Sequence, residues 1–135
     1  MKITVVKEFS FDAAHHLPGY NGKCANVHGH SYVLQIGVRG PIDFNTGMVI
    51  DFSRLKKIVN QEIIDLLDHQ DLNTLSSEPG QLGINFPYEM PTAENMVGWI
   101  VQRLQNRWDG TREDGEIVFV RLYETATSYT EWRKE

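Results

Sequence analysis

Apolar and polar positions alternate along two stretches near the start of the chain. From Ile3 to Ala14 the apolar residues fall on odd positions, broken only at Lys7, and from His28 to Arg39 they fall on even positions. A period of two predicts β-strands with one buried face. Residues 16–27 between them are rich in Gly, Pro and Asn, which predicts a loop that joins the two strands as a hairpin.

Further along, apolar residues recur at spacings of three and four. This spacing over residues 53–67 predicts an amphipathic helix, which Asp51 or Ser53 could cap. A second helix is predicted to begin after Thr92 as its cap, and its apolar stripe reaches Trp108.

The remaining segments complete an α+β pattern. Residues 116–124 alternate again, with one predicted apolar face formed by Val118, Val120 and Leu122, and residues 128–132 could add a short strand. Residues 74–91 carry several Gly and Pro and no clear period, which predicts a long loop, and residues 109–115 form a polar turn. Two strands, two helices and two strands in this order predict an α+β fold with a mainly antiparallel sheet, in a single domain over residues 1–135.

Composition and charge restrict the cellular compartment and the classes of binding partner that we expect. The 135 residues include 13 basic and 18 acidic side chains, for a net charge of −5, so we expect neither a nucleic-acid binder nor a membrane-surface binder. No apolar run approaches the roughly 20 residues of a membrane span, and the first residues do not resemble a signal peptide. The lone Cys24 cannot form an internal disulfide. We therefore expect a cytoplasmic protein.

Four of the five histidines lie between residues 15 and 30. His28 and His30 are two residues apart on a predicted strand, so their imidazoles point to the same side. His15 ends the preceding strand in phase with its apolar face, whereas His16 has the opposite parity. Three imidazoles with an open fourth position are typical of catalytic zinc sites. The spacing leaves open a second interpretation, in which these histidines are exposed or hydrogen bonded.

Cys24 lies in the loop between the same strands, beside Lys23. Near a metal and a cation its pKa would fall, and the thiolate could act as a base or nucleophile. It could also be a fourth zinc ligand or a small packing residue, and spacing does not separate these roles.

Carboxylates occupy two further positions of interest. Asp68 and His69 are adjacent at the predicted end of the first helix, where a carboxylate can orient a histidine for proton transfer. A histidine placed favourably at a helix C-terminus is the alternative. Glu124 ends the apolar face of its strand and would need a partner if buried, either a ligand with two N–H donors or a salt bridge.

Taken together in order, six segments resemble the 6-pyruvoyl-tetrahydropterin synthase and 6-carboxy-tetrahydropterin synthase family over nearly the whole chain. The segments are Phe11–His15, Cys24–His30, Gly47–Phe52, Leu67–His69, Pro91–Asn95 and Tyr123–Thr125. The resemblance implies the tunnelling fold, a four-stranded antiparallel sheet with two helices inserted between the second and third strands. It also implies homotrimers or homohexamers with sites at subunit interfaces.

The resemblance further implies roles for individual residues. It implies a zinc ion held by three histidines: His15, His28 and His30. Cys24 would be the catalytic thiol, Asp68 and His69 a proton relay, and Glu124 the anchor for a pterin ring. For the triphosphate of the substrate, the candidate cations are Lys23, Arg39, Arg54 and Lys56.

Three residues separate Cys24 from His28, which resembles the bacterial 6-carboxy-tetrahydropterin synthases of queuosine biosynthesis. The implied reaction is that of a lyase, which converts 7,8-dihydroneopterin triphosphate to 6-carboxytetrahydropterin, acetaldehyde and triphosphate. The alternatives are a 6-pyruvoyl-tetrahydropterin synthase, a noncatalytic zinc- or pterin-binding protein with the same fold, and a GTP cyclohydrolase. The loop at residues 74–90 is longer than in the short bacterial forms.

Overall fold

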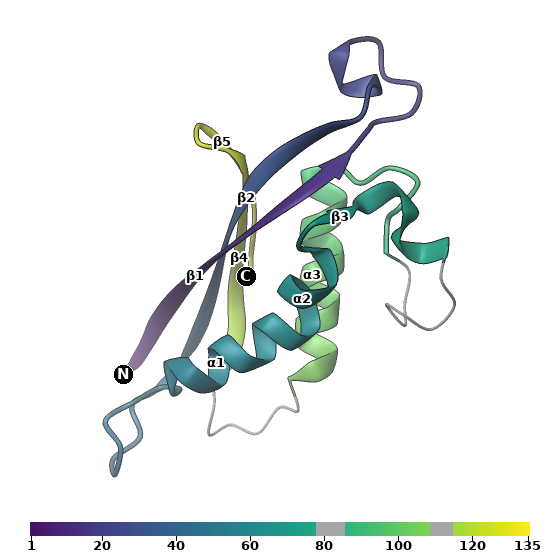
Figure 1. Ribbon diagram of the computed structural model, residues 1–135. Helices are drawn as coiled ribbons and strands as arrows, with labels where there is room; N and C mark the ends of the chain where they lie inside the picture. Colours follow the sequence, from purple (N-terminus) through teal and green to yellow (C-terminus); the bar gives the residue numbers. More distant parts are fainter. Residues whose placement is uncertain (78–85, 109–114) are drawn as a thin grey trace.

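The computed structural model describes residues 1–77, 86–108 and 115–135 (Figure 1). Four long strands form an antiparallel sheet, as predicted: β1 (Lys2–His15), β2 (His28–Pro41), β4 (Glu116–Thr125) and β5 (Ser128–Arg133). The sequence predicted four strands, but the sheet has a fifth. The two-residue strand β3 (Gln70–Asp71) pairs in parallel with β1. The order across the sheet is β3-β1-β2-β4-β5.

The helices between the second and third long strands lie on one side of the sheet (Figure 1). The predicted helix 53–67 consists of α1 (Phe52–Val59), a π-helical turn η2 (Asn60–Ile64) and a short α2 (Asp65–Leu67). Asp51, and not Ser53, caps it by accepting a hydrogen bond from the Ser53 N–H at 2.7 Å.

The second helix is α3 (Ala93–Arg107), and Thr92 caps it as predicted, through its hydroxyl and the Asn95 N–H at 3.1 Å. The helix α3 packs on β4 and β5, whereas α1 and α2 pack on β1. Buried side chains of both helical segments and of one sheet face form one hydrophobic cluster. The 3-10 turn η1 (Lys23–Ala25) lies in the predicted loop 16–27, and the 3-10 segment η3 (Leu72–Ser77) overlaps the start of the predicted loop 74–91.

The alternation in β2 and in Phe9–His15 of β1 is as the sequence predicts, but Ile3 is exposed and β4 differs. Between Gly37 and Val38 the register of β2 against β4 shifts, so that Ile117 faces Val38 and Phe119 faces Gly37. Val118 is therefore only half-buried while Ile117 is buried, which makes the predicted face wrong at Val118. Gly37 allows this close approach, because a Cβ there would lie 2.9 Å from that of Phe119. Beyond the bulge the prediction holds for Val120 and Leu122, which are both buried.

Two predicted loops lie partly outside the described residues: 78–85 of the long loop 74–91, and 109–114 of the polar turn. Within the ranges that the structure describes, no helix is long and apolar enough to cross a membrane.

Candidate metal centre and surrounding pockets

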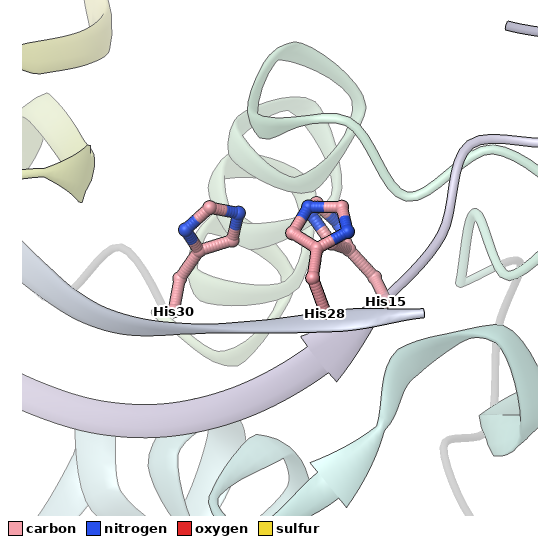
Figure 2. Close-up of side chains that lie close together, drawn as sticks. All are labelled: His15, His28 and His30. Atoms are coloured by element: carbon pink, nitrogen blue, oxygen red, sulfur yellow. The ribbon is translucent and has the colours of Figure 1, made fainter. Parts of the chain in front are cut away.

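Three imidazoles converge at the end of the β1–β2 hairpin, as Figure 2 shows. The antiparallel register places His15, the last residue of β1, directly opposite His28, the first of β2. His30 follows two residues later and therefore points to the same side of the sheet. The ring centroids lie 4.7, 5.0 and 4.9 Å apart for the pairs 15–28, 15–30 and 28–30. The structure thus brings together the three histidines that the sequence singled out.

Hydrogen bonds to the backbone orient two of these rings. Nδ1 of His15 lies 2.8 Å from the Pro91 carbonyl oxygen, and Nδ1 of His28 lies 2.7 Å from the carbonyl oxygen of Asn26. An Nδ1–H that donates to a carbonyl leaves the lone pair on Nε2, which is how metal-binding histidines are usually held. The carbonyl of Pro91, in the segment before α3, therefore orients His15, the candidate metal ligand from β1.

The three Nε2 atoms are buried and have no hydrogen-bond partner. Burial lowers the pKa of His15, and burial likewise lowers the pKa of His30 although Glu124 opposes this effect. Both imidazoles are thus kept neutral, which metal binding requires. Buried polar atoms normally have partners, so three converging unpaired nitrogens fit a metal ion with an imidazole preference, such as zinc.

Glu124 lies beside this cluster, with Oε1 at 3.6 Å from Nε2 of His30. It is half-buried near the end of β4, where the register against β5 shifts between Tyr123 and Thr125. A cavity of about 650 Å³ is lined by both His30 and Glu124, together with the backbone turn after β4. The carboxylate can therefore meet a ligand next to the metal-binding side chains.

Asp68 and His69 form a second cluster, held against β1 by backbone contacts. His69 adopts a left-handed conformation (φ 62°), and its N–H donates to the Asp12 carbonyl at 2.6 Å. The Asp12 N–H in turn donates to Oδ1 of Asp68 at 3.0 Å, and Nδ1 of His69 lies 2.9 Å from the same oxygen. The Asp12 N–H and the His69 imidazole lower the pKa of Asp68, which stays a carboxylate.

The two clusters border one another without merging. A cavity of about 520 Å³ is lined by residues of both regions, among them His30, Asp12 and His69. Cys24, in η1, is half-buried and belongs to neither cluster of candidate ligand atoms. This placement argues against Cys24 as the fourth zinc ligand.

Among the candidate cations for a triphosphate, Lys23 precedes Cys24 in η1. Arg39 lies near the other end of β2, opposite Thr4 and eleven residues beyond His28, or roughly 35 Å away along the strand. Arg39 therefore cannot reach a ligand at the histidines of its own chain.

Sequence patterns did not indicate one residue that contacts this region. Asn73 bonds to both backbone polar groups of His16, at 2.9 and 3.0 Å. Asn73 lies in η3, where the sequence has no periodic pattern. The one sequence signal for its role is that it follows Asp68 by only five residues. His16 itself stays outside the histidine cluster, as its parity predicted.

An α+β fold of this kind, with helices on one side of a mainly antiparallel sheet, is also found in a solved structure. The chain matches the structure of Caenorhabditis elegans 6-pyruvoyl tetrahydropterin synthase with a TM-score of 0.80 and 26% identity, covering 100% of this chain and 97% of that one. The tunnelling fold expected from the sequence is thus confirmed.

Sequence comparison gives the family directly. The 6-pyruvoyl tetrahydropterin synthase family profile matches residues 4–135, and this chain belongs to that family. A 6-carboxy-5,6,7,8-tetrahydropterin synthase of Haemophilus influenzae is 37% identical over 96% of this chain and 98% of its own length. A protein of the same name from Synechocystis is 39% identical over 75% of this chain and 74% of its own length. The relatives are therefore pterin synthases, and the family resemblance inferred from the six segments is confirmed.

Proposed function

We propose that this chain is a zinc-dependent 6-carboxy-5,6,7,8-tetrahydropterin synthase that acts as a lyase on 7,8-dihydroneopterin triphosphate in queuosine biosynthesis. The observation that carries the proposal is the cluster of three converging, unpaired Nε2 atoms with Glu124 at 3.6 Å from one of them. The names of the two bacterial relatives support the carboxy-forming reaction.

The three histidines would hold zinc: His15, His28 and His30. Bound there, zinc would supply a Lewis acid that polarises oxygens of the substrate side chain. The carbonyl oxygens of Pro91 and Asn26 keep two of the imidazoles in the tautomer that such binding needs.

Glu124 would accept hydrogen bonds from the 2-amino group and a ring N–H of the pterin. A carboxylate offers two acceptor oxygens, and two adjacent N–H donors match that geometry. Because Glu124 and His30 line the same cavity, a pterin bound to the carboxylate would carry its side chain toward the histidines.

Cys24 and the Asp68–His69 pair would move protons on the substrate side chain. Asp68 is a carboxylate whose oxygen contacts Nδ1 of His69, so it would orient the ring and stabilise its protonated form. Cys24, outside the histidine cluster, would serve as a base. Loss of triphosphate and cleavage of a carbon–carbon bond, with addition of one water, would release acetaldehyde. The side-chain carbon that becomes the carboxylate would be oxidised as the pterin ring is reduced, so no redox cofactor is needed.

We further propose that the working unit is a homotrimer or homohexamer. The outer edge of β5 has no neighbouring strand among the residues described, and β1 pairs on its outer edge only at Ala13 and Ala14. Open edges of this length are sites for pairing with another chain. The side chain of His69 is exposed, so it would be free to act on a substrate bound at the histidines of a neighbouring copy of the chain.

The test is incubation of the purified protein with 7,8-dihydroneopterin triphosphate and product identification by mass. Acetaldehyde together with 6-carboxytetrahydropterin supports the proposal. Formation of 6-pyruvoyl-tetrahydropterin would instead establish the second candidate, which the name of the Caenorhabditis elegans structure favours. No conversion by zinc-loaded protein would contradict both.

A further inference from the structure

The segment that carries Asp68 and His69 runs along the edge of β1 that faces away from β2. His69 bonds to the backbone of Asp12, and the two residues of β3 then pair in parallel with Ala13 and Ala14. The next contact along this edge is at His16, one residue beyond the last strand residue of β1. There the partner is a side chain, that of Asn73.

The carboxamide of Asn73 satisfies both backbone polar groups of His16. Its Oδ1 accepts from the His16 N–H at 2.9 Å, and its Nδ2 donates to the His16 carbonyl oxygen at 3.0 Å. The Asn73 N–H is itself bonded to Oδ1 of Asp71 at 3.1 Å, which fixes the local turn. A carboxamide has the donor and acceptor of a peptide group, so Asn73 extends the pairing of β1 past the point where β3 ends.

This contact lies between two parts of the proposed site. His16 directly follows His15, whose ring belongs to the histidine cluster. Leu17, the next residue, donates its N–H to the Cys24 carbonyl at 2.7 Å. The pairing of β1 with β2 ends at His15 and His28, so the backbone hydrogen bonds between these two strands do not fix the position of His16. Asn73 holds the chain at the point where it leaves the sheet toward Cys24.

We propose that Asn73 is a positioning residue, which fixes the loop carrying Cys24 relative to the histidine cluster. The inference rests on the proposed function for the role of Cys24, but the contacts it uses belong to this chain alone. His15 keeps its own supports, the β1–β2 ladder and the Pro91 carbonyl. Loss of Asn73 should therefore displace the thiol and leave metal binding intact.

The experiment compares Asn73→Ala and Asn73→Asp with the unchanged protein, all loaded with zinc. In Asn73→Ala we expect zinc to stay near one per chain and kcat to fall about 10- to 100-fold, with KM changed by less than about twofold. Cys24 is the only cysteine, so its alkylation by iodoacetamide reports on this loop alone. We expect alkylation to become about tenfold faster, because the loop opens more easily.

Asn73→Asp is the conservative variant, which keeps an acceptor for the His16 N–H and loses the donor to its carbonyl. We expect its kcat and alkylation rate to lie between those of Asn73→Ala and the unchanged protein. Asn106→Ala removes the same group from an exposed position of α3 and should match the unchanged protein in all readouts.

If the Asn73 contact is purely structural, both Asn73 variants should have a lower melting temperature. Their kcat and alkylation rate, measured well below that temperature, should then be unchanged. That result would overturn the inference. Loss of zinc from either variant would overturn it as well. If Asn73→Ala fails to fold, Asn73→Asp provides the same readouts. If the unchanged protein shows no turnover, the proposed function fails, while alkylation and zinc content still decide the role of Asn73.

Discussion

The histidine cluster and the Asp68–His69 pair are built in opposite ways. The histidines stand on two paired strands, and their free nitrogens are buried. His69 is on a turn with positive φ, its side chain is 77% exposed, and the pair is held by the backbone of Asp12, 56 residues away from Asp68 in the chain. Strand pairing gives the first region a fixed geometry, whereas the second depends on a few contacts between distant segments.

This difference in construction suggests that the two regions have different roles in the site. A buried, rigid set of ligands suits a metal, whose binding needs fixed distances and neutral imidazoles. An exposed acid–base pair suits proton exchange with a substrate or with solvent. Substitutions in the two regions should therefore have different effects on zinc content and on turnover.

The largest effect is expected from His28→Ala. Two imidazoles bind zinc far more weakly than three, so zinc and activity should both be lost, as measured by metal analysis and product formation. His16→Ala is the matched control, because it removes a neighbouring histidine outside the cluster and should keep the metal. Equal zinc content in the two variants would show that the cluster is not the metal site.

Cys24→Ala should keep about one zinc per chain and lose about 10²- to 10⁴-fold in kcat, the usual contribution of a general base. Zinc content and kcat of the same preparation are the measurements. Loss of zinc would mean that Cys24 is a ligand after all.

Asp68→Asn should lower kcat by about 10- to 100-fold and leave zinc content unchanged, because the amide can still accept from the Asp12 N–H but cannot stabilise a protonated His69. The pH profile of kcat is the discriminating readout. An unchanged profile and rate would remove the pair from the proposed mechanism.

Glu124→Gln should raise KM by roughly 10- to 100-fold, the value of one or two charge-assisted hydrogen bonds, with zinc retained. Pterin binding followed by fluorescence gives an independent measurement. If binding is unaffected and zinc is lost, the carboxylate acts on the metal centre through His30.

The smallest expected effect is on the pH dependence of stability of the metal-free protein. The pKa of His15 and that of His30 lie below 6.5 in the folded chain, chiefly because of burial. Below pH 6.5 the unfolded chain then binds more protons than the folded one, so stability should fall as the pH drops. Urea unfolding of chelator-treated protein at pH 7.5 and 5.5 measures this, and a higher stability at pH 5.5 would contradict it.

Local sequence patterns predicted the histidine cluster because parity and register are short-range properties. His28 and His30 share a face by strand geometry, and a hairpin brings His15 opposite them. The same parity identified Glu124, although the register of β4 against β5 shifts between Tyr123 and Thr125. The bulge at Val118 was not predictable, because it depends on how Phe119 packs against Gly37 of another strand.

The sequence alone determined the order of the four long strands and the two helical segments, the Thr92 cap, the three metal-binding candidates and the family, because each depends on local spacing or on short motifs. Only the tertiary structure decided that Asp12 holds Asp68 and His69, that Cys24 stands apart from the histidines, and that Asn73 secures His16. The contacts of Asp12 with Asp68 and of His16 with Asn73 join segments more than 50 residues apart, and no periodicity along the chain encodes which distant backbone a side chain will meet.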